Sequence, residues 1–333
     1  MIVRWGLEAL GDVLGEVGIR DPLVVTTARW ADAPSNGLLL GDRVPGTRVF
    51  SGVRAHAPAN TVDAAAEAAQ GSDGLLAVGG GSAIDTAKAV SARTGLAVVS
   101  VPTTYSGAEW TTSFGVRDEK ARTKGGGGGA RVAGIVYEPE LTLELPPAES
   151  AGTALNALAH CAEALYVEGR NPEAERHALA GAAAISRALP RVLADGRDVE
   201  ARRELLEGAC HAGAALAGAG LGLAHAMAQA LGGRYGLPHG ALNALCLPPA
   251  LRFNESVAEE AIARLASAMG EDDAAGRAAG LARLGGFTRL RDLGVRATEL
   301  DEVAEAAVLR PGARANPRRA TAAEVGELLR SIW

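Results

Sequence analysis

The stretch Leu75–Val90 reads LLAVGGGSAIDTAKAV, and it decides the fold of the chain. Four apolar residues, typical of a buried strand, run into three glycines and then into a helical pattern. Glycine lets the backbone approach a ligand closely, and the N-terminus of a helix offers free N–H groups and the positive end of its dipole. The stretch therefore predicts a strand–turn–helix unit with a phosphate cradle.

The spacing within this stretch separates the phosphate site from simpler interpretations. Gly79 and Gly81 fit the start of a G-x-G-x-x-G fingerprint, but Ile84 stands where the third glycine belongs, and no Walker A loop is present. A lone glycine pair would favour an ordinary strand-to-helix turn. The GGGS sequence, with Asp85 and Lys88 one helical turn apart, favours a phosphate site.

Strand-like and helix-like segments alternate through the first half of the chain. This alternation predicts parallel βαβ units. The segment Ser100–Gly107, SVPTTYSG, follows the next strand along, so we expect it at the same carboxyl edge of the sheet, where ligands bind. Its hydroxyls suit phosphate or ribose, although alone it is a common type of turn. The predicted strands are 22–27, 48–53, 75–78, 96–101 and 135–137, and the predicted helices are 61–70 and 84–94.

The character of the sequence changes near Ser150. Long Ala- and Leu-rich stretches replace the β-branched runs after Pro146-Pro147, which predicts an α/β domain over 1–149 and an all-helical domain over 150–333. The run Gly125–Gly129 predicts a flexible hairpin or loop tip. The predicted helices of the second half are 150–168, 173–189, 198–217, 221–232, 255–269, 273–283, 298–308 and 321–332.

Composition excludes several classes of protein. The 333 residues are 48% hydrophobic and 22% charged, which is the balance of a globular chain rather than a disordered one. The 43 glycines show no three-residue period, so collagen is excluded. The net charge of −6 provides no basic footprint for nucleic acid or for an anionic membrane. We therefore expect neither partner.

The cysteines and the N-terminus indicate a cellular compartment. The three cysteines are scattered without a CxxC pair, which is typical of buried thiols in a reducing environment. Charged residues at positions 4, 8, 12 and 16 interrupt any apolar signal-peptide core. The charge-free stretch Gly208–Gly233 is mostly Ala and Gly and contains two histidines, so we interpret it as an interior helix and not a membrane span. We expect a cytoplasmic protein.

Histidines gather in the helical half. Asn156 and His160 are four residues apart and share one helix face, His225 lies on a later helix, and His239 follows in a Gly/Pro-bounded turn. Taken singly, each histidine is more often a hydrogen-bonded core residue than a ligand. Their concentration in nearly charge-free helices favours a shared site, because buried polar groups must be satisfied. Of the other three histidines, we expect His177 to be solvated, His211 to lie in the core and His56 to lie in a loop.

The motifs together resemble the iron-containing alcohol dehydrogenase family, within the dehydroquinate synthase-like superfamily. The resemblance spans nearly the whole chain and is strongest to the maleylacetate reductase branch. It implies an α/β nucleotide-binding domain followed by an all-α domain. The motifs that carry it are GGGSAIDTAKAV (79–90), VPTTYSG (101–107), EPELTLELPP (138–147), NALAHCAEALY (156–166), GLAHAMAQALGGRYGLPHG (222–240) and NPRRATAAEVGELL (316–329), with FSGVRAHAP (50–58) typical of the branch.

The resemblance also implies roles for individual residues. The segment that cradles the dinucleotide pyrophosphate corresponds to Gly79, Gly80, Gly81 and Ser82, and the residues lining the nicotinamide or ribose correspond to Asp85, Thr103 and Thr104. The metal site of the family, one Asp and three His, corresponds to Asn156, His160, His225 and His239.

Loss of the carboxylate at position 156 weakens a divalent site, because less charge offsets the cation. Maleylacetate reductases share this Asn and resemble metal-independent enzymes. We therefore expect no required metal, with His160, His225 and His239 as the candidates for weak binding.

Three departures from the family bear on the chemistry. Gln229 replaces the histidine that usually follows His225 by four residues, and glutamine donates no proton at pH 7. The run Gly125–Gly129 stands where the branch carries an Arg- and Pro-containing segment, which puts dicarboxylate recognition there in question. The first strand ends in Thr26-Thr27 without an acidic residue, so NADPH and NADH are equally open as the cofactor.

The resemblance implies an NAD(P)H-dependent reductase of aromatic catabolism, and also a homodimer that forms through the N-terminal strands. Hydride would pass to a C=C or C=O bond of a small acidic substrate, with His160, His225, His239 and Asn156 in the catalytic site. On charge alone, Lys124 or Arg234 would hold a substrate carboxylate. The alternatives are a non-reductive lyase or cyclase on the same fold and a cofactor-binding protein without catalysis.

Overall fold

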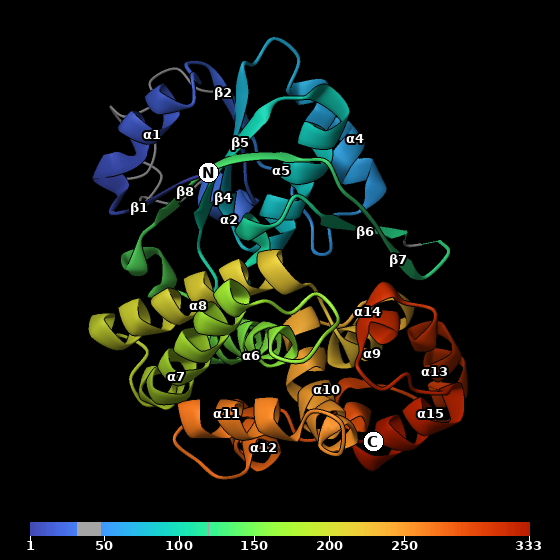
Figure 1. The fold of residues 1–333 in the computed structure, drawn as a ribbon. Helices are drawn as coiled ribbons and strands as arrows, with labels where there is room; N and C mark the ends of the chain where they lie inside the picture. The colour runs from blue at the N-terminus through green and yellow to red at the C-terminus, as the bar shows by residue number, and fades with distance from the viewer. Residues whose placement is uncertain (32–47, 119) are drawn as a thin grey trace. The chain divides into compact units, whose positions relative to one another are not determined.

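The computed structural model describes residues 1–31, 48–118 and 120–333 (Figure 1). Contacts within the chain divide it into two compact units. The first unit comprises Met1–Thr104 and Ala108–Thr142, and the second comprises Tyr105–Gly107 and Leu143–Trp333. The short segment Tyr105–Gly107 thus belongs to the second unit although it is surrounded in sequence by the first.

The first unit is built on a six-stranded parallel sheet in the order β1-β8-β5-β4-β2-β3. Its central strand β4 pairs in register with β5, so that Val78 lies beside Val101 and Gly79 beside Pro102. The carboxyl ends of β4 and β5 therefore meet at one edge, as predicted. The strands are β1 (Ile2–Trp5), β2 (Pro22–Val25), β3 (Arg48–Phe50), β4 (Gly74–Gly79), β5 (Ala97–Pro102) and β8 (Arg131–Tyr137).

Both faces of this sheet are covered by helices, which explains why its strands are apolar on both sides. On one face Leu76 and Val78 of β4 join a buried cluster with residues of α1 (Leu10–Glu16) and α2 (Ala28–Ala31). On the other face Leu75 and Ala77 pack in a second cluster with residues of α4 (Ala59–Ala68) and α5 (Gly81–Thr94). The result is a three-layer α/β arrangement.

The run Gly125–Gly129 does not form a loop tip. The strand β7 (Thr123–Gly127) contains the first three of these glycines and pairs antiparallel with β6 (Phe114–Asp118), so these three lie in the ladder of a hairpin and the last two follow it. Backbone hydrogen bonds need no side chain, and the facing ring of Phe114 occupies the space where a Cβ of Gly127 would lie. Of the two alternatives predicted for this run, the hairpin is confirmed and the loop tip was wrong.

The second unit is helical in every element longer than a single turn (Figure 1). Its long helices α6, α7 and α8 pack against one another, and their many Ala residues permit close packing. The α-helices are α6 (Pro147–Ala164), α7 (Pro172–Ala194), α8 (Val199–Ala219), α9 (Leu223–Tyr235), α10 (His239–Asn254), α11 (Glu259–Ala268), α12 (Ala274–Leu284), α13 (Leu300–Val308), α14 (Pro311–Ala315) and α15 (Ala322–Ser331).

One long helix, α10, was not predicted from the sequence. Helix α10 continues through Pro248 and Pro249, which the sequence signals treat as breakers, and these prolines lie inside the second half of the helix. His239, which was expected in a turn, is the first residue of α10, so that prediction was wrong. The α/β-plus-α fold class itself is confirmed.

No single helix in the described ranges is long and apolar enough to cross a membrane. The helices α8 and α9 meet the length and composition criterion only as a pair, and they are bent by 99° at the break between them.

Candidate active site

The glycine turn after β4 has the geometry of a ligand cradle. Gly79 adopts φ +145°, a backbone conformation that side chains rarely tolerate. A Cβ on Gly80 would lie 2.8 Å from Cγ2 of Thr104, so the turn also lacks room for a side chain. Helix α5 starts at Gly81 without a side-chain cap, and its first N–H groups and positive dipole end therefore suit an anion.

Residues of the neighbouring strand complete this edge of the sheet. The backbone N–H of Thr103 donates to the carbonyl of Gly79 at 3.1 Å, which holds the end of β5 against the cradle. Within the described part of the chain, the buried Oγ1 of Thr104 has no hydrogen-bond partner. A buried hydroxyl without a partner is costly unless a ligand or water satisfies it. The structure thus places Gly79–Ser82, Thr103 and Thr104 together.

The carboxylate of Asp85 is bonded within the protein through both of its oxygens. Its Oδ1 pairs with the ammonium of Lys88 at 3.0 Å, and its Oδ2 accepts the N–H of Gly115 at 3.1 Å. The buried Lys88 also donates to the carbonyls of Ala108 and Ser113. These contacts clamp the segment 108–115 to α5, so the Asp–Lys spacing noted in the sequence organises the wall beside the cradle.

Three histidines of the second unit lie together, as their spacing in the sequence suggested. His160 on α6 and His225 on α9 stack with ring centroids 4.6 Å apart and planes 14° apart. The ring of His239, at the start of α10, is centred 5.7 Å from that of His225. Each of three different helices therefore contributes one imidazole to this histidine cluster, which we define as His160, His225 and His239.

Asn156 is held by an amide network rather than pointing at open space. Its Nδ2 donates to the carbonyl of Ser106 at 3.0 Å, and its Oδ1 accepts from Nδ2 of Asn243 at 2.7 Å. The same Nδ2 of Asn243 lies 3.1 Å from Nε2 of His239. The pair Asn156–Asn243 therefore links α6, α10 and the segment Tyr105–Gly107 at the edge of the histidine cluster.

The segment Tyr105–Gly107 is fastened to the second unit at both ends. The hydroxyl of Tyr105 accepts from the buried guanidinium of Arg202 at 3.2 Å, and the backbone N–H of Tyr105 donates to Oγ1 of Thr153 at 3.3 Å. At the other end, a Cβ on Gly107 would approach Nδ1 of His160 to 3.4 Å. The close backbone approach at Gly107 leaves His160 covered on that side.

Sequence reasoning missed Glu163, which makes the shortest contact to the histidine cluster. Its carboxylate is fully buried and lies 2.6 Å from Nδ1 of His225. It also accepts the backbone N–H groups of Gly222 at 2.7 Å and of His225 at 3.2 Å. The motif NALAHCAEALY contains this residue, but 62 positions separate it from His225, so only the fold reveals the pairing.

Electrostatics differ between the stacked rings. Burial lowers the pKa of His160 well below its ordinary value of 6.5, and the charge of His225 lowers it further. His160 is therefore neutral at neutral pH. Two stacked imidazoles cannot both be positively charged without a cost in free energy, because like charges at this distance repel.

The same geometry shows how the residues relate to a metal ion. Imidazole lone pairs lie in the ring plane, so nearly parallel stacked rings do not converge on one ion. Asn156 contributes no charge, and its amide is already bonded on both sides. Among the residues that the structure describes, no three His, Cys, Asp or Glu side chains are grouped so as to hold a metal. As arranged here, the histidine cluster does not fit a metal ion.

The remaining histidines and Arg234 are not part of the histidine cluster, and Lys124 lies beside Gly115 in the first unit. His177 and His211 are both half-buried, with their Nδ1 atoms 2.8 Å apart, so the solvated and core assignments were both wrong: the two form a pair between α7 and α8. His56 is in a loop, as predicted, and its N–H donates to Oγ of Ser82. Arg234 forms ion pairs with Glu299 and Glu302, so its charge is offset within the protein.

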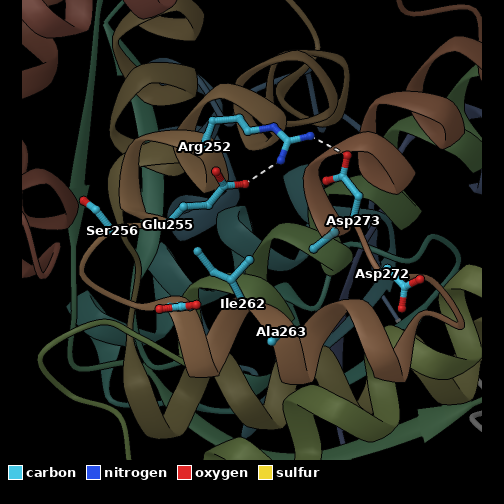
Figure 2. A pocket seen from close by; sticks show the side chains of 9 residues that line it. Arg252, Glu255, Ser256, Ile262, Ala263, Asp272 and Asp273 are labelled. Carbon is cyan, nitrogen blue, oxygen red and sulfur yellow. Dashed lines mark hydrogen bonds and ion pairs between the residues drawn. The ribbon is translucent and has the colours of Figure 1, made fainter.

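An open cleft of about 510 Å³ lies apart from these groups in the second unit (Figure 2). Arg252 forms ion pairs with Glu255 and Asp273, so the positive charge of this lining residue is neutralised by two other lining residues. None of the predicted site residues lines this cleft. Its lining residues are Arg252, Glu255, Ser256, Glu259, Ile262, Ala263, Asp272, Asp273 and Ala274.

Comparison with known protein families follows the division of the chain. Residues 3–133 match the family model for iron-containing alcohol dehydrogenase, and residues 150–333 match that for the C-terminal part of the Fe-containing alcohol dehydrogenase family. Both models describe iron-containing enzymes, so they do not support the expectation that no metal is required. That expectation rests on the residues alone.

Curated relatives extend over most of the chain. A maleylacetate reductase from Sphingobium indicum is 36% identical over 326 residues, covering 97% of this chain and 92% of the relative. Maleylacetate reductase 1 from Rhodococcus opacus is 36% identical over 287 residues, covering 85% and 80%.

Solved structures agree in fold. Maleylacetate reductase from Agrobacterium tumefaciens superimposes with a TM-score of 0.89 at 32% identity, covering 100% of this chain and 95% of that one. An iron-containing alcohol dehydrogenase from Corynebacterium glutamicum gives a TM-score of 0.91 at 31% identity, with coverage of 100% and 94%.

The pair His177–His211 generates a prediction for stability. Burial, and then the charge of His177, lowers the pKa of His211 below 6.5, while Glu207 opposes the shift. Since the unfolded state then binds the proton more readily, the stability contributed by His211 is present above the unfolded pKa and is lost as the pH falls below it. We expect His211→Gln to make the fall in unfolding free energy between about pH 7 and pH 5 shallower, by at most one proton.

Urea denaturation at several pH values measures this slope. The variant Asp198→Leu is a control because it removes a helix cap from α8 without touching the pair. Its slope should show no such change in the histidine range. Equal slopes for wild type and His211→Gln would contradict the prediction.

Proposed function

This chain belongs to the iron-containing alcohol dehydrogenase family, and from that premise we propose that it reduces a C=C or C=O bond of a small acidic substrate, with maleylacetate as the leading candidate. Family membership makes the chain an NAD(P)H-dependent oxidoreductase acting on a small molecule, as the motifs predicted. The comparisons do not favour the alternative of a lyase or cyclase. The substrate is inferred from the relatives, which are maleylacetate reductases over almost the whole chain.

The first unit would bind the dinucleotide. The turn Gly79–Ser82 has no room for side chains and opens onto the start of α5, so it suits the pyrophosphate. The hydroxyl of Thr104 is buried beside it and would donate to the ligand. Asp85 would act by holding the adjacent wall through Lys88 and Gly115. When bound, the dinucleotide supplies the hydride; NADH and NADPH both remain candidates.

The second unit would handle the proton. Hydride addition to an electron-poor bond leaves negative charge on the substrate, which a proton or a hydrogen-bond donor must neutralise. The histidine cluster offers imidazoles in a buried setting, where hydrogen bonds to developing charge are strong. Burial keeps His160 neutral, so we do not assign it the role of proton donor. His225 would relay the proton to the substrate, with Asn156 and His239 orienting the group being reduced.

The single observation that carries this proposal is the buried histidine cluster. An Ala- and Gly-rich core gains nothing in stability from three imidazoles, two of which stack. The nitrogens Nδ1 of His160 and Nε2 of His225 are buried and have no hydrogen-bond partner in the part of the chain that the structure describes. Such atoms are explained by a ligand that bonds to them in the working enzyme.

Stopped-flow absorbance at 340 nm tests the function. NADH or NADPH should be consumed when maleylacetate is added, and His225→Ala should lower kcat about 10²- to 10⁴-fold while the Kd of the dinucleotide stays within about threefold. Gly80→Val is the matched variant, because filling the cradle should weaken dinucleotide binding and leave the histidine cluster intact. Absence of binding of either dinucleotide would refute the proposed activity, and turnover of short aldehydes alone would refute the acidic substrate.

We also propose that turnover requires no metal, because Asn156 contributes no charge and is bonded on both sides of its amide, and the stacked rings do not converge on one ion. Protein dialysed against EDTA, with its metal content measured by mass spectrometry, should keep its kcat within about twofold. The variant Asn156→Asp should gain affinity for Zn²⁺ and lose stability, since a carboxylate oxygen would then face the carbonyl of Ser106. Activity that disappears with the metal and returns with Fe²⁺ or Zn²⁺ would refute this proposal.

We further propose a cytoplasmic homodimer that forms through the N-terminal strands. In the sheet formed by the described residues, β1 lies at the edge beside β8, and an edge strand is a ready site for pairing between chains. Light scattering after gel filtration should give the mass of two chains. A monomer mass at micromolar concentration would rule out the dimer.

A further inference from the structure

We propose that Glu163 is a positioning residue that holds His225 in the Nδ1–H tautomer, so that the unprotonated Nε2 is the atom offered to a ligand. In neutral histidine one ring nitrogen carries the proton and the other is an acceptor, and the partner of one nitrogen sets the state of the other. Glu163 lies 2.6 Å from Nδ1 of His225, and Nε2 is buried with no hydrogen-bond partner among the described residues. The tautomer therefore decides what the histidine cluster can do.

The donors around Glu163 indicate that it is an acceptor. Its Oε2 receives the N–H of Gly222 at 2.7 Å, and its Oε1 receives the N–H of His225 at 3.2 Å. Both groups belong to the start of α9, where Gly222 is the N-cap and provides no side chain. Glu163 thus caps α9 from α6, and both of its carboxylate oxygens are engaged as acceptors of backbone N–H groups. We therefore place the proton of the 2.6 Å bond on Nδ1 of His225.

Close packing holds this arrangement in place within the described part of the chain. Glu163 and His225 are both buried, and a Cβ on Gly222 would lie 3.0 Å from the carboxylate. The ring of His225 is also held between those of His160 and His239. Rotation of the imidazole by 180° would exchange Nδ1 for a carbon opposite Glu163 and leave the buried carboxylate without its side-chain partner, which costs free energy. The tautomer and the ring orientation are therefore fixed together.

This arrangement refines the proposed function. The tautomer itself does not depend on that function, and only its kinetic consequence rests on it. A bare Nε2 accepts a hydrogen bond from a substrate O–H, and it protonates the reduced product only after it has taken up a proton from water, which it then passes on. A His225 with the proton already on Nε2, and a bare Nδ1 toward Glu163, would present a fixed donor instead. The position of one hydrogen thus separates two kinds of binding site built from the same side chains.

Nitrogen-15 NMR of histidine-labelled protein reads the tautomer directly, without turnover. We expect the His225 signals, assigned by their loss in His225→Gln, to show a protonated Nδ1 and a bare Nε2 at neutral pH. Glu163→Gln can keep its carbonyl oxygen toward both Gly222 and Nδ1, and it should preserve this pattern. Glu163→Leu removes the acceptor and should yield the Nε2–H form or a mixture. A wild-type His225 with a bare Nδ1 would overturn the proposal, even if Glu163→Leu failed to fold.

Kinetics give the second readout. Glu163→Leu should lower kcat about 10- to 100-fold with little change in the KM for NAD(P)H, and Glu163→Gln should fall between Glu163→Leu and wild type. Asp198→Leu, which removes the carboxylate that caps α8, controls for the loss of a helix cap in the same unit. An equal loss of kcat in Glu163→Leu and Asp198→Leu would reduce Glu163 to a structural role. An inactive wild type with the expected NMR pattern would refute the reductase function and leave the tautomer intact.

Discussion

A carboxylate buried in an almost charge-free helical core must be satisfied from within the chain, and the organisation of the second unit depends on this constraint. Glu163 meets it by accepting two backbone N–H groups from the start of α9 and one from the ring of His225. Desolvation makes each of these bonds costly to lose. Helix α6 therefore fixes where α9 begins, and through the pair Asn156–Asn243 it also fixes the start of α10.

The parts of the fold that could be predicted from sequence are those with local causes. The strand Gly74–Gly79 and the helix that follows it were evident because apolar residues, three glycines and an amphipathic pattern lie within one stretch. The glycines remain where the strand ends, because φ at Gly79 excludes other residues. The short strand β1 was missed, since four residues give too little pattern, and α10 was missed because two prolines lie within it.

The candidate site divides along the same line. His160, His225 and His239 stood out because imidazoles are rare in Ala-rich helices, and the structure brings them together. Glu163 carried no such signal, since a single glutamate in a helix is usually solvated. Its partners lie about 60 residues away and are mostly backbone groups, which have no signature in the sequence. The tertiary fold supplies that information.

The segment Tyr105–Gly107 makes the second unit discontinuous in sequence. A fragment starting at Leu143 would contain every helix of that unit and still lack the hydroxyl that Arg202 bonds and the carbonyl that Asn156 bonds. The buried donor groups of Arg202 and Asn156 would lose these acceptors, or water would enter the core to replace them. The helical half therefore depends on three residues that lie within the sequence of the α/β half. A gene fragment that begins at the apparent boundary would encode an incomplete core.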